Sequence, residues 1–129
     1  MLHNAGRDWA ASSMFDRSPA RAATADYIAV SASTVPPAAG DTTLAGEIAT
    51  AGLGRRQATW AHTAGAATST LTATFVATAA DALPVTLAKA AVLNAAAGGV
   101  MPFSEVLSAP APLNLVNDAV TITVTVTHA

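Results

Sequence analysis

The side chains that most often carry chemistry are few in this sequence and lie far apart. Its three histidines, His3, His62 and His128, match none of the spacings by which proteins bind metal ions. The carboxylates outside the N-terminal region are equally scattered, mostly next to predicted turns: Asp41, Glu47, Asp81, Glu105 and Asp118. We therefore predict no metal site and no acid–base pair. We expect these carboxylates to hydrogen-bond the backbone of nearby turns.

Nucleophilic catalysis and phosphate binding are not indicated either. The chain has no cysteine, and no serine lies in a Gly-x-Ser-x-Gly sequence. The Gly52–Arg56 segment (GLGRR) lacks the glycine and lysine spacing of a phosphate-binding loop, and no predicted helix follows it. We interpret it as a turn that enters a strand. Arg55 and Arg56 are then available as bidentate partners for Glu47 or for a carboxylate of a neighbouring chain. These observations predict a protein that is not an enzyme and needs no cofactor.

Two rows of alternating threonines suggest a binding surface of another kind. They lie at Thr70–Thr74 and Thr121–Thr127. A flat threonine face can order water or contact sugars, and Trp60 is the aromatic residue in a predicted strand that could serve as a sugar platform. A glycan-binding surface for host recognition is therefore one alternative. An ordinary outer sheet face, or a face packed on a neighbour, is the simpler interpretation.

The composition indicates a surface made for assembly. Hydrophobic residues make up 52% of the 129 residues, but many are alanine, and aromatic residues make up only 5%. Such a core buries little apolar area per side chain. Charged residues account for 11%, against about 25% in typical soluble proteins. We therefore expect the chain to bury further area against copies of itself, as a trimer or ring, and against other proteins.

Charge and hydropathy exclude two classes of partner. The net charge is −2 and Lys89 is the single lysine, which argues against a protein that follows a nucleic-acid backbone. No apolar run approaches the roughly 20 residues that span a bilayer, so we expect no membrane contact. Asp8 lies where a signal peptide needs its apolar stretch. We expect a chain made in the cytoplasm without an export signal.

The N-terminal region, residues 1–24, is predicted to be a helix followed by an arm. Asn4 is a suitable N-cap, and the helix is expected from Ala5 to Asp16. Its main apolar side chains are Trp9, Met14 and Phe15. The segment that ends the helix consists of Ser18-Pro19, flanked by Arg17 and Arg21. The helix either packs on the following domain or docks as an arm on a neighbouring subunit.

Residues 25–129 have a period of two and are predicted to form one mainly β domain. The expected strands are Tyr27–Ala32, Arg56–His62, Thr68–Val76, Val85–Leu93, Val100–Leu107 and Val120–Thr127. Pro110 and Pro112 are expected to end the fifth of these strands. Short strands separated by turn residues predict an antiparallel β-sandwich or a Greek-key barrel.

Several segments of the chain resemble a family of short proteins encoded by tailed phages and prophages of actinobacteria. The segments are Asn4–Asp8, Tyr27–Ser31, Pro37–Ile48, Gly54-Arg55, Ala58–Gly65, Leu71–Phe75 and Val85–Lys89. Members of this family are described as tail-fibre-like or minor tail proteins. The resemblance implies a structural role in the virion and carries no catalytic residues.

The resemblance and the composition together give the functional expectation. We expect a tail-associated virion protein, at the tail tip or the fibre base, that acts through oligomeric assembly with other virion proteins. A capsid decoration protein on the phage head is the alternative within the same class. The residues expected at interfaces are Trp9, Met14, Phe15, Arg55, Arg56 and Trp60.

Overall fold

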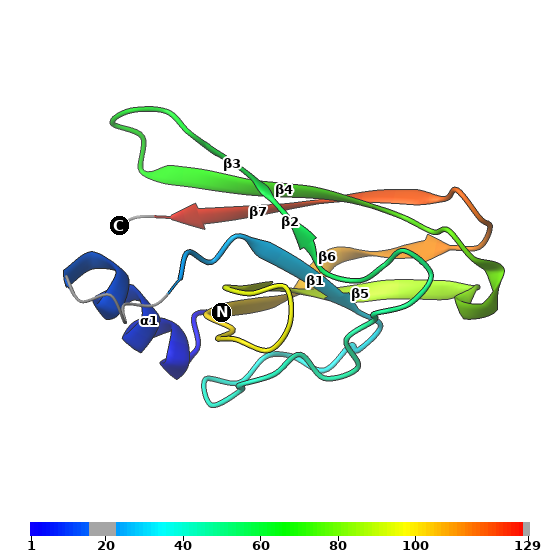
Figure 1. The fold of residues 1–129 in the computed structure, drawn as a ribbon, viewed down its shortest axis with the longest axis horizontal. Helices are drawn as coiled ribbons and strands as arrows, with labels where there is room; N and C mark the ends of the chain where they lie inside the picture. Colours follow the sequence, from blue (N-terminus) through cyan, green and yellow to red (C-terminus); the bar gives the residue numbers. More distant parts are fainter. Residues whose placement is uncertain (16–22, 128–129) are drawn as a thin grey trace.

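The chain is described by a computed structural model that covers residues 1–15 and 23–127, and these residues form a two-layer antiparallel β-sandwich (Figure 1). The elements are α1 (Asn4–Phe15), β1 (Tyr27–Ser31), β2 (Arg56–Gln57), β3 (Thr59–His62), β4 (Thr68–Val76), a 3-10 turn η1 (Ala80–Ala82), β5 (Val85–Leu93), β6 (Phe103–Leu113) and β7 (Ala119–Thr127). Among the described residues, sheet A has the strand order β2-β1-β5-β6 and sheet B has the order β3-β4-β7. The prediction of a mainly β fold is confirmed, and the sandwich is the form that it takes.

Sheet B follows directly from the alternation in the sequence. β4 and β7 pair antiparallel along their whole length, from Thr68 opposite Thr127 to Val76 opposite Ala119. Their apolar side chains point toward sheet A, where Phe75 is fully buried. The period-two prediction is therefore confirmed for both strands.

Sheet A is covered on both faces, and this explains why β5 is mostly apolar. One face packs against sheet B through Ile28, Val30, Leu87 and Val92. The opposite face carries a smaller core made by Ala29, Leu44, Ala91, Leu93 and Met101. A strand that is buried on both faces has no need of alternating polar residues.

The single strand predicted over Arg56–His62 is wrong in one respect, because the chain changes layers within it. β2 pairs with β1 in sheet A, whereas β3 pairs with β4 in sheet B. Ala58 lies between them, packs against the main core and donates its backbone N–H to the Asp26 carbonyl at 2.7 Å. The crossing joins the two layers at this point.

The prediction that Pro110 and Pro112 end a strand is also wrong. β6 begins at Phe103, later than predicted, and continues through both prolines to Leu113. β6 is an edge strand that pairs with β5 on one side. A proline is tolerated there because its missing N–H removes no bond from the ladder when it faces the open edge.

The N-terminal helix packs on the β domain. α1 begins at Asn4, and the His3 carbonyl accepts the N–H groups of Gly6 and Arg7, so His3 rather than Asn4 holds the capping position. Trp9 packs against the main core. The structure does not describe the predicted end of the helix at Asp16 or the arm residues Arg17, Ser18, Pro19 and Arg21. His128 also lies outside the described residues.

Candidate functional site

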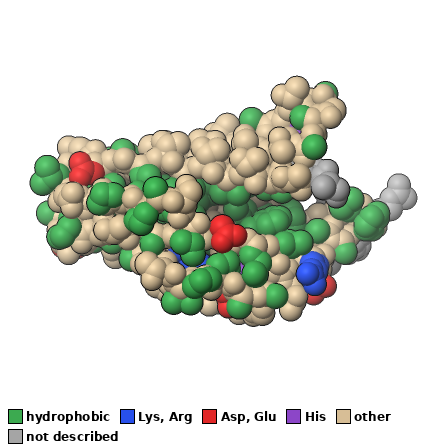
Figure 2. All heavy atoms as spheres, turned by 180° about the vertical axis from the view of Figure 1, so that it is seen from behind, with side chains coloured by type: hydrophobic (Ala, Val, Ile, Leu, Met, Phe, Trp, Pro, Cys, Tyr) green, Lys and Arg blue, Asp and Glu red, His purple; other side chains and the backbone are tan. Residues whose placement is uncertain are grey.

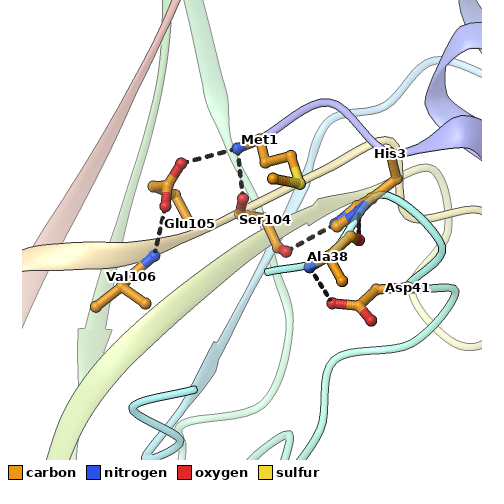
Figure 3. Close-up of polar contacts among 7 residues, drawn as sticks. All are labelled: Met1, His3, Ala38, Asp41, Ser104, Glu105 and Val106. Carbon is orange, nitrogen blue, oxygen red and sulfur yellow. Dashed lines mark hydrogen bonds and ion pairs between the residues drawn. The ribbon is translucent and has the colours of Figure 1, made fainter. Parts of the chain in front are cut away.

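His3 anchors the N-terminal segment to the β domain (Figure 3). It is completely buried, and its Nδ1 donates to the Ala38 carbonyl at 2.8 Å. Its Nε2 forms a second hydrogen bond with the Ser104 hydroxyl at 2.7 Å. The Ala38 N–H in turn donates to Asp41 at 2.9 Å. One ring therefore ties the chain start, the loop after β1 and strand β6 together, which is a structural role.

The carboxylates stabilise the fold in different ways, and two of them bond the backbone of turns as predicted. The Met1 ammonium group lies 2.9 Å from Glu105 Oε2, and this hydrogen bond lowers the pKa of Glu105 (Figure 3). Asp118 Oδ2 accepts the N–H groups of Leu115 (2.9 Å) and Asn114 (2.8 Å), which lowers the pKa of Asp118. The prediction of carboxylates that stabilise turns is confirmed for Asp41 and Asp118.

Arg55 forms an internal ion pair. Its Nε and Nη2 donate to the two carboxylate oxygens of Glu47 at 2.7 and 2.9 Å, and its Nη1 donates to the carbonyls of Ala95 and Gly98. The hydrogen bond to Glu47 raises the pKa of Arg55. The bidentate pair with Glu47 is confirmed for Arg55. Within the described part of the chain, Arg56 makes no such pair and donates to the Gly52 carbonyl at 3.4 Å.

The three apolar residues of α1 have different environments. The ring of Trp9 meets Phe103 edge-on, with centroids 6.5 Å apart, and its Nε1 donates to the Ala23 carbonyl. Met14 and Phe15 are 73% and 79% exposed. Trp9 therefore docks the helix, whereas Met14 and Phe15 form an exposed apolar surface that we call the α1 tip.

No protein-family model, curated protein or solved structure matches this chain. The surfaces formed by the described residues are therefore the features that indicate a function. Within these residues no group of three or more His, Asp or Glu side chains could hold a metal ion. No helix in the same part of the chain is long and apolar enough to cross a membrane.

Trp60 is exposed, but it does not share a face with the threonines. It is 63% exposed, stacks on His62 with a centroid distance of 5.9 Å, and lies opposite Leu71 in the β3–β4 pair. Directly paired residues point to the same face, so Trp60 points to the inward side of sheet B with Leu71. Trp60 and the threonine face therefore do not form one continuous surface, and glycan binding stays an untested alternative.

The two threonine rows meet on the outward face of sheet B. The register places Thr70 opposite Thr125 and Thr72 opposite Thr123. At the next pair, the hydroxyls of Thr74 and Thr121 lie 3.0 Å apart. The sequence predicted each row but not that they lie side by side, because the pairing of β4 with β7 spans about half of the chain.

An apolar groove opens between β6 and β7, where the two sheets are not closed against each other. Its volume is about 490 Å³. Its apolar lining comes from both layers: Ala90, Val92, Phe103, Leu107, Ile122, Val124 and Val126. Figure 2 shows hydrophobic side chains inside this hollow between the two layers. Sequence reasoning missed the groove, because the groove depends on how far the two sheets overlap.

Proposed function

We propose that this chain is a non-enzymatic structural subunit of a bacteriophage particle, associated with the tail, that works by assembling with other virion proteins. The observation that carries the proposal is the α1 tip. Met14 and Phe15 lie next to each other at the end of a helix that Gly6 and Trp9 fix to the β domain, yet both are largely exposed. Large neighbouring apolar side chains on a firmly placed element are typical of a protein contact.

The distribution of charge supports the same proposal. The single lysine, Lys89, is only 4% exposed, and Arg55 and Glu47 satisfy each other. The outer surface is thus even poorer in free charge than the composition indicates. Few charges favour association with protein surfaces, whereas nucleic-acid backbones require a basic surface.

The location in the particle is the part of the proposal that an experiment can decide most directly. Immunogold labelling of purified particles with an antibody to this chain is expected to place gold at the tail end in electron micrographs. The tail is proposed because of the resemblance to short tail-associated proteins. Gold over the head would replace the tail assignment by a capsid decoration role. Particles without gold, and without the chain on quantitative gels, would refute the virion role.

The α1 tip gives the proposal a test at residue level. Met14→Ser with Phe15→Ser is expected to reduce the copies of the chain per particle about tenfold or more, because burial of each side chain is worth roughly 1.5–3 kcal/mol. The stability of the isolated chain should change by less than about 0.5 kcal/mol, since both residues are exposed.

The copy number is measured by quantitative gel analysis of purified particles. Val35→Ser is the matched control, because Val35 is also exposed but lies in the loop after β1. Equal copy numbers for the wild-type chain and the double variant would contradict a role of the α1 tip in assembly.

A further inference from the structure

Strand β7 presents a long open edge. It spans nine residues, about 30 Å, and among the described residues its one partner strand is β4. Its sequence, AVTITVTVT, contains no charge and no proline. The backbone groups along its other side are therefore free to pair with a further strand.

The other three sheet edges formed by the described residues are protected or short. β6 has Pro110 and Pro112 along its second half, and Leu2 forms a bridge with Phe103 at its start. β2 has two residues, one of them Arg56, and β3 has four. Proteins protect their sheet edges by these means, so β7 is the edge at which strand addition is expected.

The groove between the sheets lies along the same edge. Ile122, Val124 and Val126 of β7 point into it, and Leu107 lines its other side. A strand added next to β7 would lie about 4.8 Å further out, above this opening. The charged residue that lines the groove, Glu105, is paired with the Met1 ammonium group. The groove therefore favours an uncharged strand with apolar residues at alternate positions.

We propose that the occupant is the β7 strand of a second copy, paired antiparallel about a two-fold axis. The two three-stranded B sheets then form one continuous six-stranded sheet. Because β7 alternates regularly, an antiparallel self-pair in an even register places Val and Ile beside Val and Ile on the inward face. Thr lies beside Thr on the outward face, as Thr74 and Thr121 already do within the chain. The inward side chains of each partner strand cover the groove of the other copy.

The symmetry of this contact restricts the assembly. A two-fold contact uses the same surface on both copies, so a closed assembly that contains it has an even number of chains. Of the trimer and the ring expected from the sequence, only an even-membered ring is compatible with it. This self-contact is one of the assembly contacts of the virion subunit proposed above, so it rests on that proposed function. It can be tested on the purified chain alone.

Cysteine cross-linking tests the antiparallel pairing, because the natural chain contains no cysteine. Single substitutions Thr121→Cys, Ile122→Cys, Thr123→Cys, Val124→Cys and Thr125→Cys are oxidised with copper phenanthroline and separated on non-reducing gels. Covalent dimer is expected to peak at one position and to fall on both sides, because one residue faces its own copy across the axis. Thr59→Cys, exposed on the opposite edge of sheet B, is the control and should remain monomeric. No peak along β7, or equal dimer at Thr59→Cys, would overturn the proposal.

Charge at the edge provides the second test. Thr123→Lys with Thr125→Lys places like charges on paired strands and is expected to weaken the dimer at least tenfold in light scattering over a concentration series. Thr59→Lys with Ala61→Lys makes the same change on the opposite edge and should leave the dimer intact. A wild-type chain that is monomeric in solution but labelled with gold in particles would refute the β7 contact and leave the proposed function standing. A dimer cross-linked at β7 together with particles that lack the chain would refute the function and leave the contact standing.

Discussion

Replacement of Arg55 by alanine is expected to lower the free energy of unfolding by about 3 kcal/mol, because a partly buried bidentate ion pair and two further hydrogen bonds are lost together. The side chains of Arg55 and Glu47 are 12% and 24% exposed, so the Glu47 carboxylate would remain largely desolvated without its partner. The carbonyls of Ala95 and Gly98 would lose their donor as well. The turn before β2 and the loop after β5 would both be released.

Two further variants separate the geometry of this pair from its charge. Arg55→Lys is expected to lose about 2 kcal/mol, because lysine keeps the charge but cannot bind both carboxylate oxygens and two carbonyls at once. Arg56→Ala is the matched control and should change the stability by less than about 0.5 kcal/mol, since Arg56 is exposed and makes one long hydrogen bond. Stabilities are measured by urea unfolding followed by circular dichroism. A loss below about 1 kcal/mol for Arg55→Ala would contradict the structural role.

The elements that the sequence predicted best are those whose environment repeats along the strand. β4 and β5 have the predicted bounds, and β7 differs by one residue at its start. From Leu71 to Phe75 in β4 and from Val120 to Thr127 in β7, apolar residues alternate with threonines, so the local pattern is sufficient to assign the inward face. β5 is mostly apolar on both faces and is bounded by Pro84 and by the turn after Leu93.

The wrong predictions concern properties that depend on the position of a strand in its sheet. Nothing in the segment Arg56–His62 shows that its first residues belong to one layer and its last to the other. The prolines of β6 are compatible with a strand only because β6 is an edge, which is decided by the pairing of distant segments. The same limit applies to Trp60, whose face depends on its register with Leu71.

Whether a predicted interface residue is exposed also depends on tertiary contacts that the sequence does not show. Trp9, Met14, Phe15 and Trp60 are large apolar residues, and the sequence assigned all four to interfaces. Tertiary packing separates them: Trp9 packs on Phe103, and Trp60 stacks on His62. Only the adjacent pair at the end of α1 is left without a comparable contact in the described part of the chain. The groove beside β7 was missed because it depends on how far the two sheets overlap.

The second large effect is expected at Gly6, where α1 rests on the β domain. Gly6 is buried, and a Cβ atom at this position would collide with the Pro102 carbonyl and approach Pro102 Cα and Leu2 Cδ1 to 2.7 Å. Gly6→Ala is therefore expected to lower the free energy of unfolding by about 2–3 kcal/mol through overpacking against the backbone. On an isolated helix the same change would stabilise by about 1 kcal/mol, so the sign of the effect shows whether α1 is docked.

The variant is best measured in a Trp60→Phe background, in which Trp9 is the only tryptophan and reports on the docking of α1. We expect a lower urea midpoint and a red-shifted Trp9 emission, because the ring would leave its contact with Phe103. Gly40→Ala is the control and should be close to neutral, since no atom lies within 4 Å of a Cβ at Gly40. If Gly6→Ala stabilises the chain and leaves the Trp9 emission unchanged, α1 does not rest on Pro102. Met14 and Phe15 would then not be presented from a fixed position, and the α1 tip would lose its main structural support as an assembly surface.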